Sequence, residues 1–101
     1  MARELPRPSQ VVDLHPQAFL NDWEDYSADE LLVESLDLLR TSLDQAIYWE
    51  YPEIKFIHGK GKGILRKEVY NELATYRSSG AISRYYPSYQ NEDIVVVVIG
   101  I

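Results

Sequence analysis

Apolar residues in the middle of the chain recur at steps of three and four positions, which predicts a long amphipathic helix. The helix is expected to begin at Ser27, because Glu30 follows three residues later and the two side chains can form a capping box. It should end before Pro52, since proline cannot continue a helix. The stripe expected to enter the core consists of Leu32, Leu36, Leu39, Leu43 and Ile47.

Shorter apolar segments on both sides of this helix predict four strands and a second helix. Two short strands are expected at residues 11–15 and 54–58, before and after the long helix. A second helix should follow the glycine-rich residues 59–63. Its apolar positions at four-residue steps are Leu65, Val69 and Leu73. The last two strands are expected at residues 81–86 and 94–101, and the unbroken apolar run in the latter is typical of a central strand buried on both faces.

This succession predicts one α/β domain with the element order β-α-β-α-β-β over residues 11–101. A strand–helix–strand connection is almost always a right-handed crossover between parallel neighbours, so the first two strands should be parallel. The pattern leaves open whether the two helices share one face of the sheet. Residues 17–26 are expected to form a loop or a short irregular helix. Residues 1–10 contain two prolines and no hydrophobic pattern, which favours a flexible lead-in or a linker from a larger protein.

Composition narrows the classes of function. The 101 residues include no cysteine, which excludes disulfides, thiolate metal ligands and a cysteine nucleophile, and favours a reducing compartment. No apolar run reaches the roughly 20 residues needed to span a bilayer, and the N-terminus lacks the layout of a signal peptide. We therefore expect a cytoplasmic protein that is not a membrane protein.

The net charge of −6 argues at first against a nucleic-acid partner, which usually requires a basic surface. The charge is unevenly distributed, however. Residues 13–53 contain eleven acidic side chains and one base, whereas residues 55–67 contain five bases and no acid. The second segment therefore provides a strong local positive charge that suits a phosphate-bearing ligand.

Chemically active side chains should meet at one edge of the sheet. Ligands of open α/β sheets tend to bind beyond the carboxyl ends of parallel strands, where His15 and His58 are expected to lie. Asp13 and His15 should point to the same side of their strand, roughly 7 Å apart along the backbone. An imidazole, which titrates near pH 6.5, could take a proton from water or from a ribose 2′-hydroxyl, with the aspartate orienting the ring.

The segment after the second strand has the composition of a phosphate-binding loop. Its glycines can adopt positive φ and allow the backbone to approach a ligand, while the start of the next helix attracts anions. The residues of this predicted loop and its basic flank are Gly59, Lys60, Gly61, Lys62, Gly63, Arg66 and Lys67. The spacing matches neither a Walker A loop nor a dinucleotide fingerprint, which excludes the usual ATPase and NAD-enzyme motifs.

Two motifs, Val12-Asp13-Leu14-His15 and Ile57-His58-Gly59-Lys60-Gly61, some 45 residues apart, resemble the paired signature motifs of Small MutS-Related (Smr) domains. The resemblance covers residues 11–101. It implies a two-layer α/β sandwich with a mixed four-stranded sheet, similar to the C-terminal domain of bacterial translation initiation factor three. Some members of this family nick DNA or cleave RNA, and others only bind.

The resemblance also implies roles for individual residues. Asp13 and His15 become the candidates for catalysis, and His58, with the neighbouring glycines, would build the substrate site and could protonate the leaving oxygen. The flanking bases would hold phosphate. The first motif usually ends in glycine, whereas Pro16 stands there in this chain and removes a backbone N–H. An endonuclease and a non-catalytic module that binds nucleic acid or a ribonucleoprotein therefore both remain as functions.

Several other interpretations of these residues stay open. Asp13, His15 and His58 could ligate a divalent metal such as magnesium, or the histidines could simply bond to neighbouring carbonyls at strand ends. The glycine-rich segment could be only a tight strand-to-helix turn. A group of tyrosines could stack on unpaired bases or cover a sheet edge; these are Tyr85, Tyr86 and Tyr89. The acidic first helix could be a solvated face or could dock a basic protein partner.

Overall fold

The long helix begins and packs as its sequence predicts. The computed structural model describes residues 5–59 and 63–100, in which α2 spans Ala28–Tyr48. The Ser27 side chain accepts a hydrogen bond from the Glu30 backbone N–H, and the Glu30 carboxylate accepts one from the Ser27 N–H, which completes the capping box. The leucines of the stripe are buried or packed against the core, so the helix contributes one apolar face to the interior.

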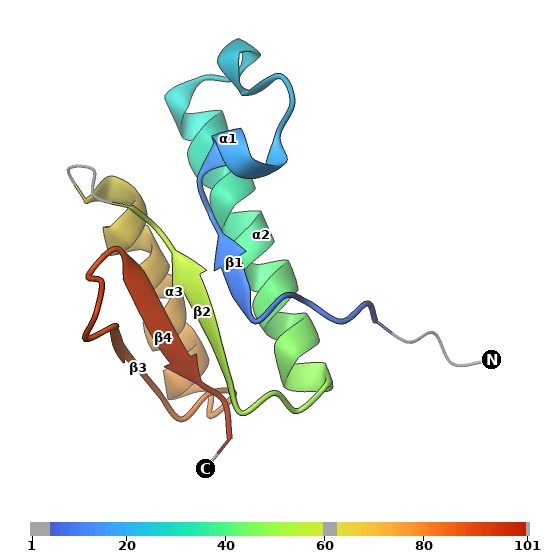
Figure 1. Cartoon of the computed structure of the whole chain (residues 1–101), viewed down its shortest axis with the longest axis vertical. Helices are drawn as coiled ribbons and strands as arrows, with labels where there is room; N and C mark the ends of the chain where they lie inside the picture. Colours follow the sequence, from blue (N-terminus) through green and yellow to red (C-terminus); the bar gives the residue numbers. More distant parts are fainter. Residues whose placement is uncertain (1–4, 60–62, 101) are drawn as a thin grey trace.

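Four strands form one mixed sheet, which confirms the predicted α/β class. They are β1 (Val11–Asp13), β2 (Glu53–Ile57), β3 (Arg84–Pro87) and β4 (Ile94–Val98), in the spatial order β1-β2-β4-β3. The first two strands are parallel, as their crossover connection predicts, and the other two pairs are antiparallel. β4 therefore lies inside the sheet (Figure 1), and its middle residues Val95, Val96 and Val97, which point alternately to the two faces, are at most 5% exposed.

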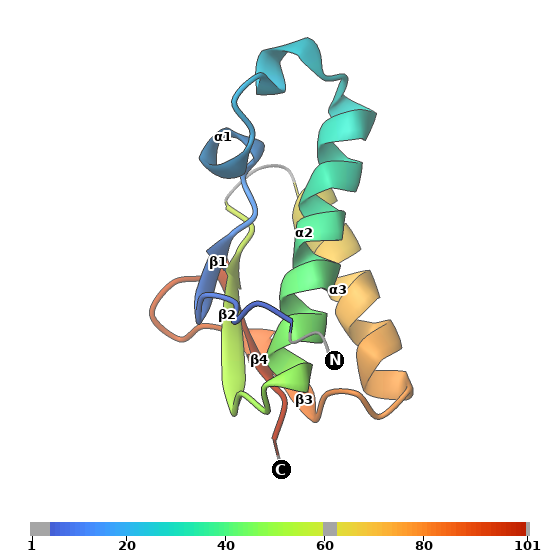
Figure 2. The same cartoon turned by 90° about the vertical axis from the view of Figure 1, so that its right-hand side faces the viewer.

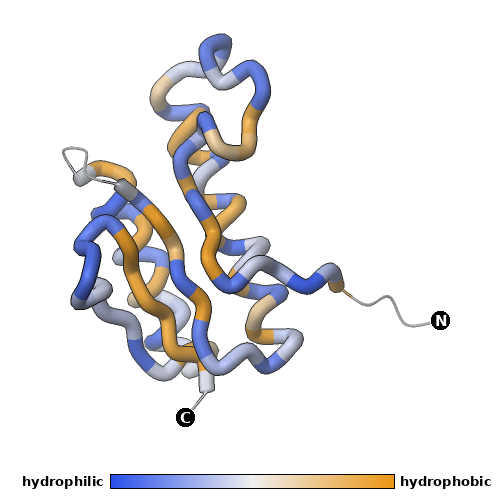
Figure 3. Tube along the Cα trace, viewed as in Figure 1, coloured by the Kyte–Doolittle hydropathy of each residue, from blue (hydrophilic) through white to orange (hydrophobic). Residues whose placement is uncertain are grey.

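The second long helix, α3 (Ile64–Ser78), lies beside α2, and both helices cover the same face of the sheet (Figure 2). The core fills the space between the helices and this face, where Leu39, Leu43, Phe56, Val69 and Leu73 are fully buried. Apolar residues concentrate accordingly along β2 and β4 (Figure 3). None of the helices in the described residues is long and apolar enough to cross a membrane.

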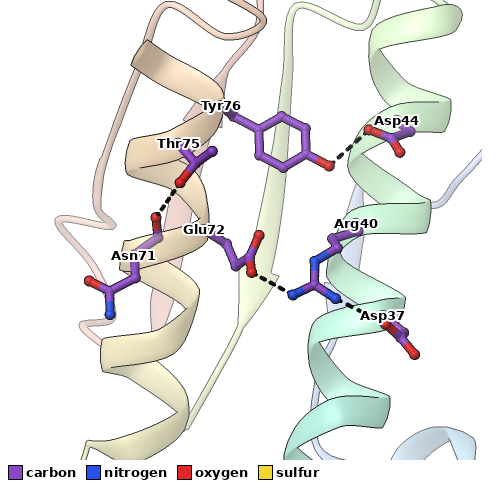
Figure 4. A network of polar contacts seen from close by, with 7 residues as sticks. All are labelled: Asp37, Arg40, Asp44, Asn71, Glu72, Thr75 and Tyr76. Atoms are coloured by element: carbon purple, nitrogen blue, oxygen red, sulfur yellow. Dashed lines mark hydrogen bonds and ion pairs between the residues drawn. The ribbon is translucent and has the colours of Figure 1, made fainter. Parts of the chain in front are cut away.

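Polar side chains join α2 to α3 at the rim of the core (Figure 4). Arg40 donates hydrogen bonds to Asp37 on its own helix and to Glu72 on α3. The Tyr76 hydroxyl donates to the Asp44 carboxylate over 2.9 Å, and burial together with this carboxylate raises the pKa of the phenol well above its usual range. These contacts fix the relative position of the two helices, although exposed ion pairs contribute little stability.

The acidic segment between β1 and α2 folds into two short helical turns, α1 (Pro16–Phe19) and η1 (Trp23–Asp25). Pro16 occupies the first turn of α1, where its missing N–H costs nothing. α1 stops β1 earlier than the predicted end at residue 15, because the chain turns immediately after Leu14. The segment extends past the sheet at the same end as the carboxyl ends of β1 and β2 (Figure 1).

The residues before β1 contact the end of α2. The Trp49 indole N–H donates to the Leu5 carbonyl over 2.8 Å, and the Tyr51 hydroxyl donates to the Pro8 carbonyl over 2.6 Å. The Arg7 guanidinium carbon lies 4.1 Å from the centre of the Trp49 ring. Residues 5–10 therefore pass over the end of the helix that lies farthest from the acidic turns.

Candidate functional site

Asp13 and His15, which we call the dyad, form a hydrogen-bonded pair at the carboxyl end of β1. One carboxylate oxygen of Asp13, Oδ1, accepts a hydrogen bond from the His15 backbone N–H over 2.9 Å and lies 2.6 Å from Nδ1 of the His15 ring. The two side chains are 43% and 42% exposed, respectively. The same oxygen thus fixes both the turn of the chain and the orientation of the imidazole, while the ring stays accessible from outside.

The other side of the imidazole lies directly on Gly59, just after β2. Gly59 has φ +81°, and a Cβ atom built on it would come within 2.1 Å of Nε2 of His15. A side chain of any size at this position would therefore have to displace the ring. The glycine is required here for two independent reasons, its left-handed backbone and the close approach of His15.

Backbone hydrogen bonds hold the strand ends that carry these residues. The Leu14 N–H donates to the Ile57 carbonyl over 2.9 Å, and the buried Ser35 hydroxyl of α2 donates to the Leu14 carbonyl over 2.7 Å. The N–H groups of His58 and Gly59 both donate to the Asp93 carbonyl, over 2.8 and 3.3 Å. Three separate segments therefore fix the backbone beside the dyad.

Two of these anchoring residues, Ser35 and Asp93, are absent from the sequence-based site. Ser35 carries a recognisable sequence signal, since it is a polar residue on the apolar stripe between Leu32 and Leu39. In the structure it is only 1% exposed. Asp93 acts through its backbone carbonyl, and a main-chain acceptor leaves no trace in the residue type. Sequence patterns could have identified the first of these residues but not the second.

His58 lies at the same end of the sheet but on the opposite face. It continues the alternation of Ile54 and Phe56 into the core and is 4% exposed, with its ring 6.1 Å from that of Tyr70 in an edge contact. Burial lowers the pKa of His58, and the positive charge of Arg66 lowers it further. The ring is therefore held neutral, and Nε2 of His58 has no hydrogen-bond partner among the described residues.

The predicted phosphate loop is described only at its two ends. Lys60, Gly61 and Lys62 lie outside the described residues. Gly63 caps the start of α3 with φ +86°, and no atom lies within 4 Å of a Cβ built there, so this glycine serves the backbone turn alone. The two bases in the first turn of α3 are exposed to solvent, as phosphate binding requires; they are Arg66 and Lys67.

The three candidate metal ligands are not gathered into one cluster. Among residues 5–59 and 63–100, no group of three or more histidine, cysteine, aspartate or glutamate side chains is arranged to hold a metal ion. The dyad faces outward, while the His58 ring points into the core. A metal at this site would therefore need oxygen ligands from water or from the bound substrate.

Comparison with known proteins connects this arrangement to a family. The sequence model described as the Smr domain matches residues 31–99, a range that contains His58 and Gly59 and begins after the dyad. The chain is also 35% identical over 78 residues to the protein named Endonuclease MutS2 of Staphylococcus saprophyticus subsp. saprophyticus. This similarity covers 77% of the chain and 10% of the relative, so the chain spans about a tenth of that protein's length. Because the family model matches more than half of the residues of the chain, the chain belongs to the Smr domain family.

Proposed function

We propose that this domain binds nucleic acid and cleaves its phosphodiester backbone at the dyad. The observation that carries this proposal is the geometry of the imidazole, which is oriented by a carboxylate on one side and packed on a glycine on the other, with 42% of its side chain exposed. The similarity to a protein named an endonuclease supports the same class of reaction. We propose in addition that the fold resembles the C-terminal domain of translation initiation factor three. We also propose that the domain is cytoplasmic and forms part of a larger protein.

The chemistry follows from the hydrogen bond within the dyad. Asp13 accepts the proton of Nδ1, which leaves the lone pair on Nε2 of His15 free to act as a general base. In the proposed step, the oxygen of water or of a ribose 2′-hydroxyl attacks phosphorus and transfers its proton to Nε2. The bond between phosphorus and the leaving oxygen breaks, and that oxygen takes a proton from the solvent or from a second acid.

His58 is the residue predicted to supply this second proton, and that role stays a prediction. Its burial and its lowered pKa favour a positioning role instead, because a neutral imidazole in the core is a poor proton donor near pH 7. The Nδ1 atom of His58 lies 3.1 Å from the Gly59 carbonyl oxygen. We propose that His58 keeps Gly59 in the conformation that accommodates the ring of the dyad.

Phosphate would be held by the basic flank of the site. Arg66 and Lys67 are exposed in the first turn of α3, and they follow the lysines of the predicted loop in the sequence. With about four phosphates engaged, affinity should fall roughly 50-fold to 150-fold between 50 and 200 mM salt. Replacing Arg66 by alanine should reduce this salt dependence, whereas Arg77→Ala, which removes an equal charge at the other end of α3, should leave it unchanged.

The decisive experiment measures cleavage by the wild type and by two dyad variants. Supercoiled plasmid and a structured RNA are incubated with each protein at low salt, with magnesium or with a chelator, and the products are resolved on gels. His15→Ala should lower the cleavage rate about 100-fold to 10,000-fold, and Asp13→Asn should lower it less, while affinity changes little. Equal cleavage by wild type and His15→Ala would reject the dyad as the catalytic centre.

A binding module without catalysis is the second candidate, and one observation favours it. The family match includes His58 and Gly59 but begins after the dyad, so the part of the chain shared with the family model does not depend on Asp13 or His15. In that case the basic residues alone would decide affinity. Intact substrates in every lane, together with a shift on a native gel that Arg66→Ala weakens, would identify this function.

A further inference from the structure

The open face of the sheet, opposite α2 and α3, carries side chains that the proposed reaction does not use. Strand register aligns Tyr86, Val96, Lys55 and Val11 in one row across this face, since each pairs with the next on the neighbouring strand. Asp13 lies on the same face, two residues after Val11. The row therefore joins the β3 edge of the sheet to the strand that ends at the dyad.

One exposed and one half-buried aromatic ring mark the β3 end of this row. Tyr89 is 96% exposed, and its ring lies 5.7 Å from that of Tyr86 with an angle of 31° between the planes. The Arg84 guanidinium carbon lies 5.6 Å from the centre of the Tyr86 ring. The connection between β3 and β4 that carries Tyr89 projects away from the helices (Figure 2). Tyr89 thus presents its ring to solvent, beside the tilted and partly buried ring of Tyr86 and the Arg84 cation.

We propose that this open face binds an unpaired single strand, with bases stacked on Tyr86 and Tyr89 and the backbone passing Lys55 toward the dyad. The inference rests on the proposed function and specifies its substrate class. Aromatic rings bind bases of any sequence through their faces, while nearby cations attract the phosphates, which is how many proteins hold single strands. A duplex, whose bases are already stacked on one another, cannot use these rings.

The dimensions of the sheet set the length of the bound strand. Three strand spacings of about 4.8 Å separate β3 from β1, which gives a distance of roughly 14 Å. A stacked strand advances about 3.4 Å per nucleotide, so roughly four nucleotides cross this distance. Besides Asp13, the open face carries the acidic residue Glu53, which pairs with Val98 at the end of the face away from the dyad and does not interrupt this path.

Binding is measured by fluorescence anisotropy with three labelled probes of 12 nucleotides or base pairs: oligothymidylate, an abasic oligomer with the same backbone, and a duplex. All proteins carry His15→Ala, so that no strand is cut during the titration. Tyr89→Ala should weaken binding of oligothymidylate about 5-fold to 100-fold, since each stacked base contributes roughly 1–3 kcal/mol. Tyr89→Phe should stay within about twofold of the parent, because it keeps the ring.

Tyr48→Ala is the matched control, because it removes a 49% exposed tyrosine from α2, remote from the open face, and its affinity should not change. Tyr89 is chosen over Tyr86 because it is almost completely exposed, so its replacement by alanine should not destabilise the fold. Equal affinity of Tyr89→Ala and its parent for oligothymidylate, or tight binding of the abasic oligomer, would overturn the inference. If Tyr89→Ala weakens binding relative to its parent while the wild type never cleaves strands, the proposed nuclease fails and the binding face stands. If the wild type cleaves and Tyr89→Ala binds normally, only the binding face fails.

Discussion

The two histidines of this domain lie at the same end of one sheet and have opposite environments. His15 is 42% exposed at its side chain, faces outward and contacts a carboxylate, whereas His58 is 4% exposed and packs against the aromatic ring of Tyr70. An apolar environment stabilises the neutral form of an imidazole, whereas a carboxylate bonded to Nδ1 orients the ring. Two residues of the same type are therefore suited to different work, one to proton transfer and the other to packing.

This difference arises from the alternation of side chains along neighbouring strands. His58 follows Ile54 and Phe56 on the core face, while His15 follows Asp13 on the open face. Gly59 connects the two environments, since its backbone follows His58 and its missing side chain makes room for His15. Three sets of variants test the contrast between the histidines. They change Gly59, the serine that holds the end of β1, and the buried ring of His58, in this order.

Gly59→Ala should have the largest effect, because it acts on both requirements of the site. The added Cβ would overlap Nε2 of His15 and force the ring away from its position, so the proposed cleavage should fall at least about 100-fold. The left-handed backbone adds a cost of about 1–2 kcal/mol to the folded state. Cleavage assays and thermal unfolding measure the two effects separately.

Gly80→Ala provides the control for this variant. Gly80 also has a positive φ, +84°, but no atom lies within 4 Å of a Cβ built there, and it follows α3 at a distance from the dyad. It should show the same loss of stability with full activity. Equal losses of activity in both variants would mean that backbone strain, and not the position of the ring, explains the effect.

The sequence patterns that predict this fold correctly are those to which several residues contribute. The stripe of α2, its capping box and the apolar run of β4 each repeat or combine several signals, and each is confirmed. The two turns between β1 and α2 depend on a few local contacts of a mixed segment, so the sequence pattern predicts only a loop or a short irregular helix there. Alternation correctly indicates that Asp13 and His15 share a side. That they act together in catalysis stays a prediction.

Ser35→Ala should have the next largest effect, through the strand end that carries the dyad. The variant removes the hydroxyl that donates to the Leu14 carbonyl and leaves that buried acceptor without this partner, which should cost about 1–3 kcal/mol. Urea unfolding measures the change. Ser42→Ala is the matched control, because Ser42 is a similarly buried serine of the same helix, 5% exposed, without a side-chain hydrogen bond among the described contacts. A loss as large in Ser42→Ala would show that burial of serine, and not the bond to β1, stabilises this region.

The sequence predicts that the two histidines lie on different faces of the sheet, but it does not predict how deeply His58 is buried. Alternation alone places His58 on the face of Phe56, yet how deeply it is buried depends on Tyr70, which arrives from α3. The close contact between His15 and Gly59 joins residues 44 positions apart, and no local pattern encodes such a distance. Contacts between elements therefore decide the character of the site, whereas patterns within elements decide its location.

The smallest effect is a change in the pH dependence of stability, which should depend on His58. The pKa of His58 is lowered in the folded state from its usual value of 6.5, so below that pH the unfolded chain binds more protons than the folded one. Its contribution to stability is therefore lost as the pH falls from 6.5 toward the folded pKa. Urea unfolding at several values between pH 7.5 and about 5 should show a decline in the wild type that His58→Phe reduces. Carboxylates that do not interact with His58 contribute equally to both proteins and cancel in the difference; Asp93, which does interact with it, is the exception. If His58→Phe kept the full decline of the wild type, the buried ring could not be its source.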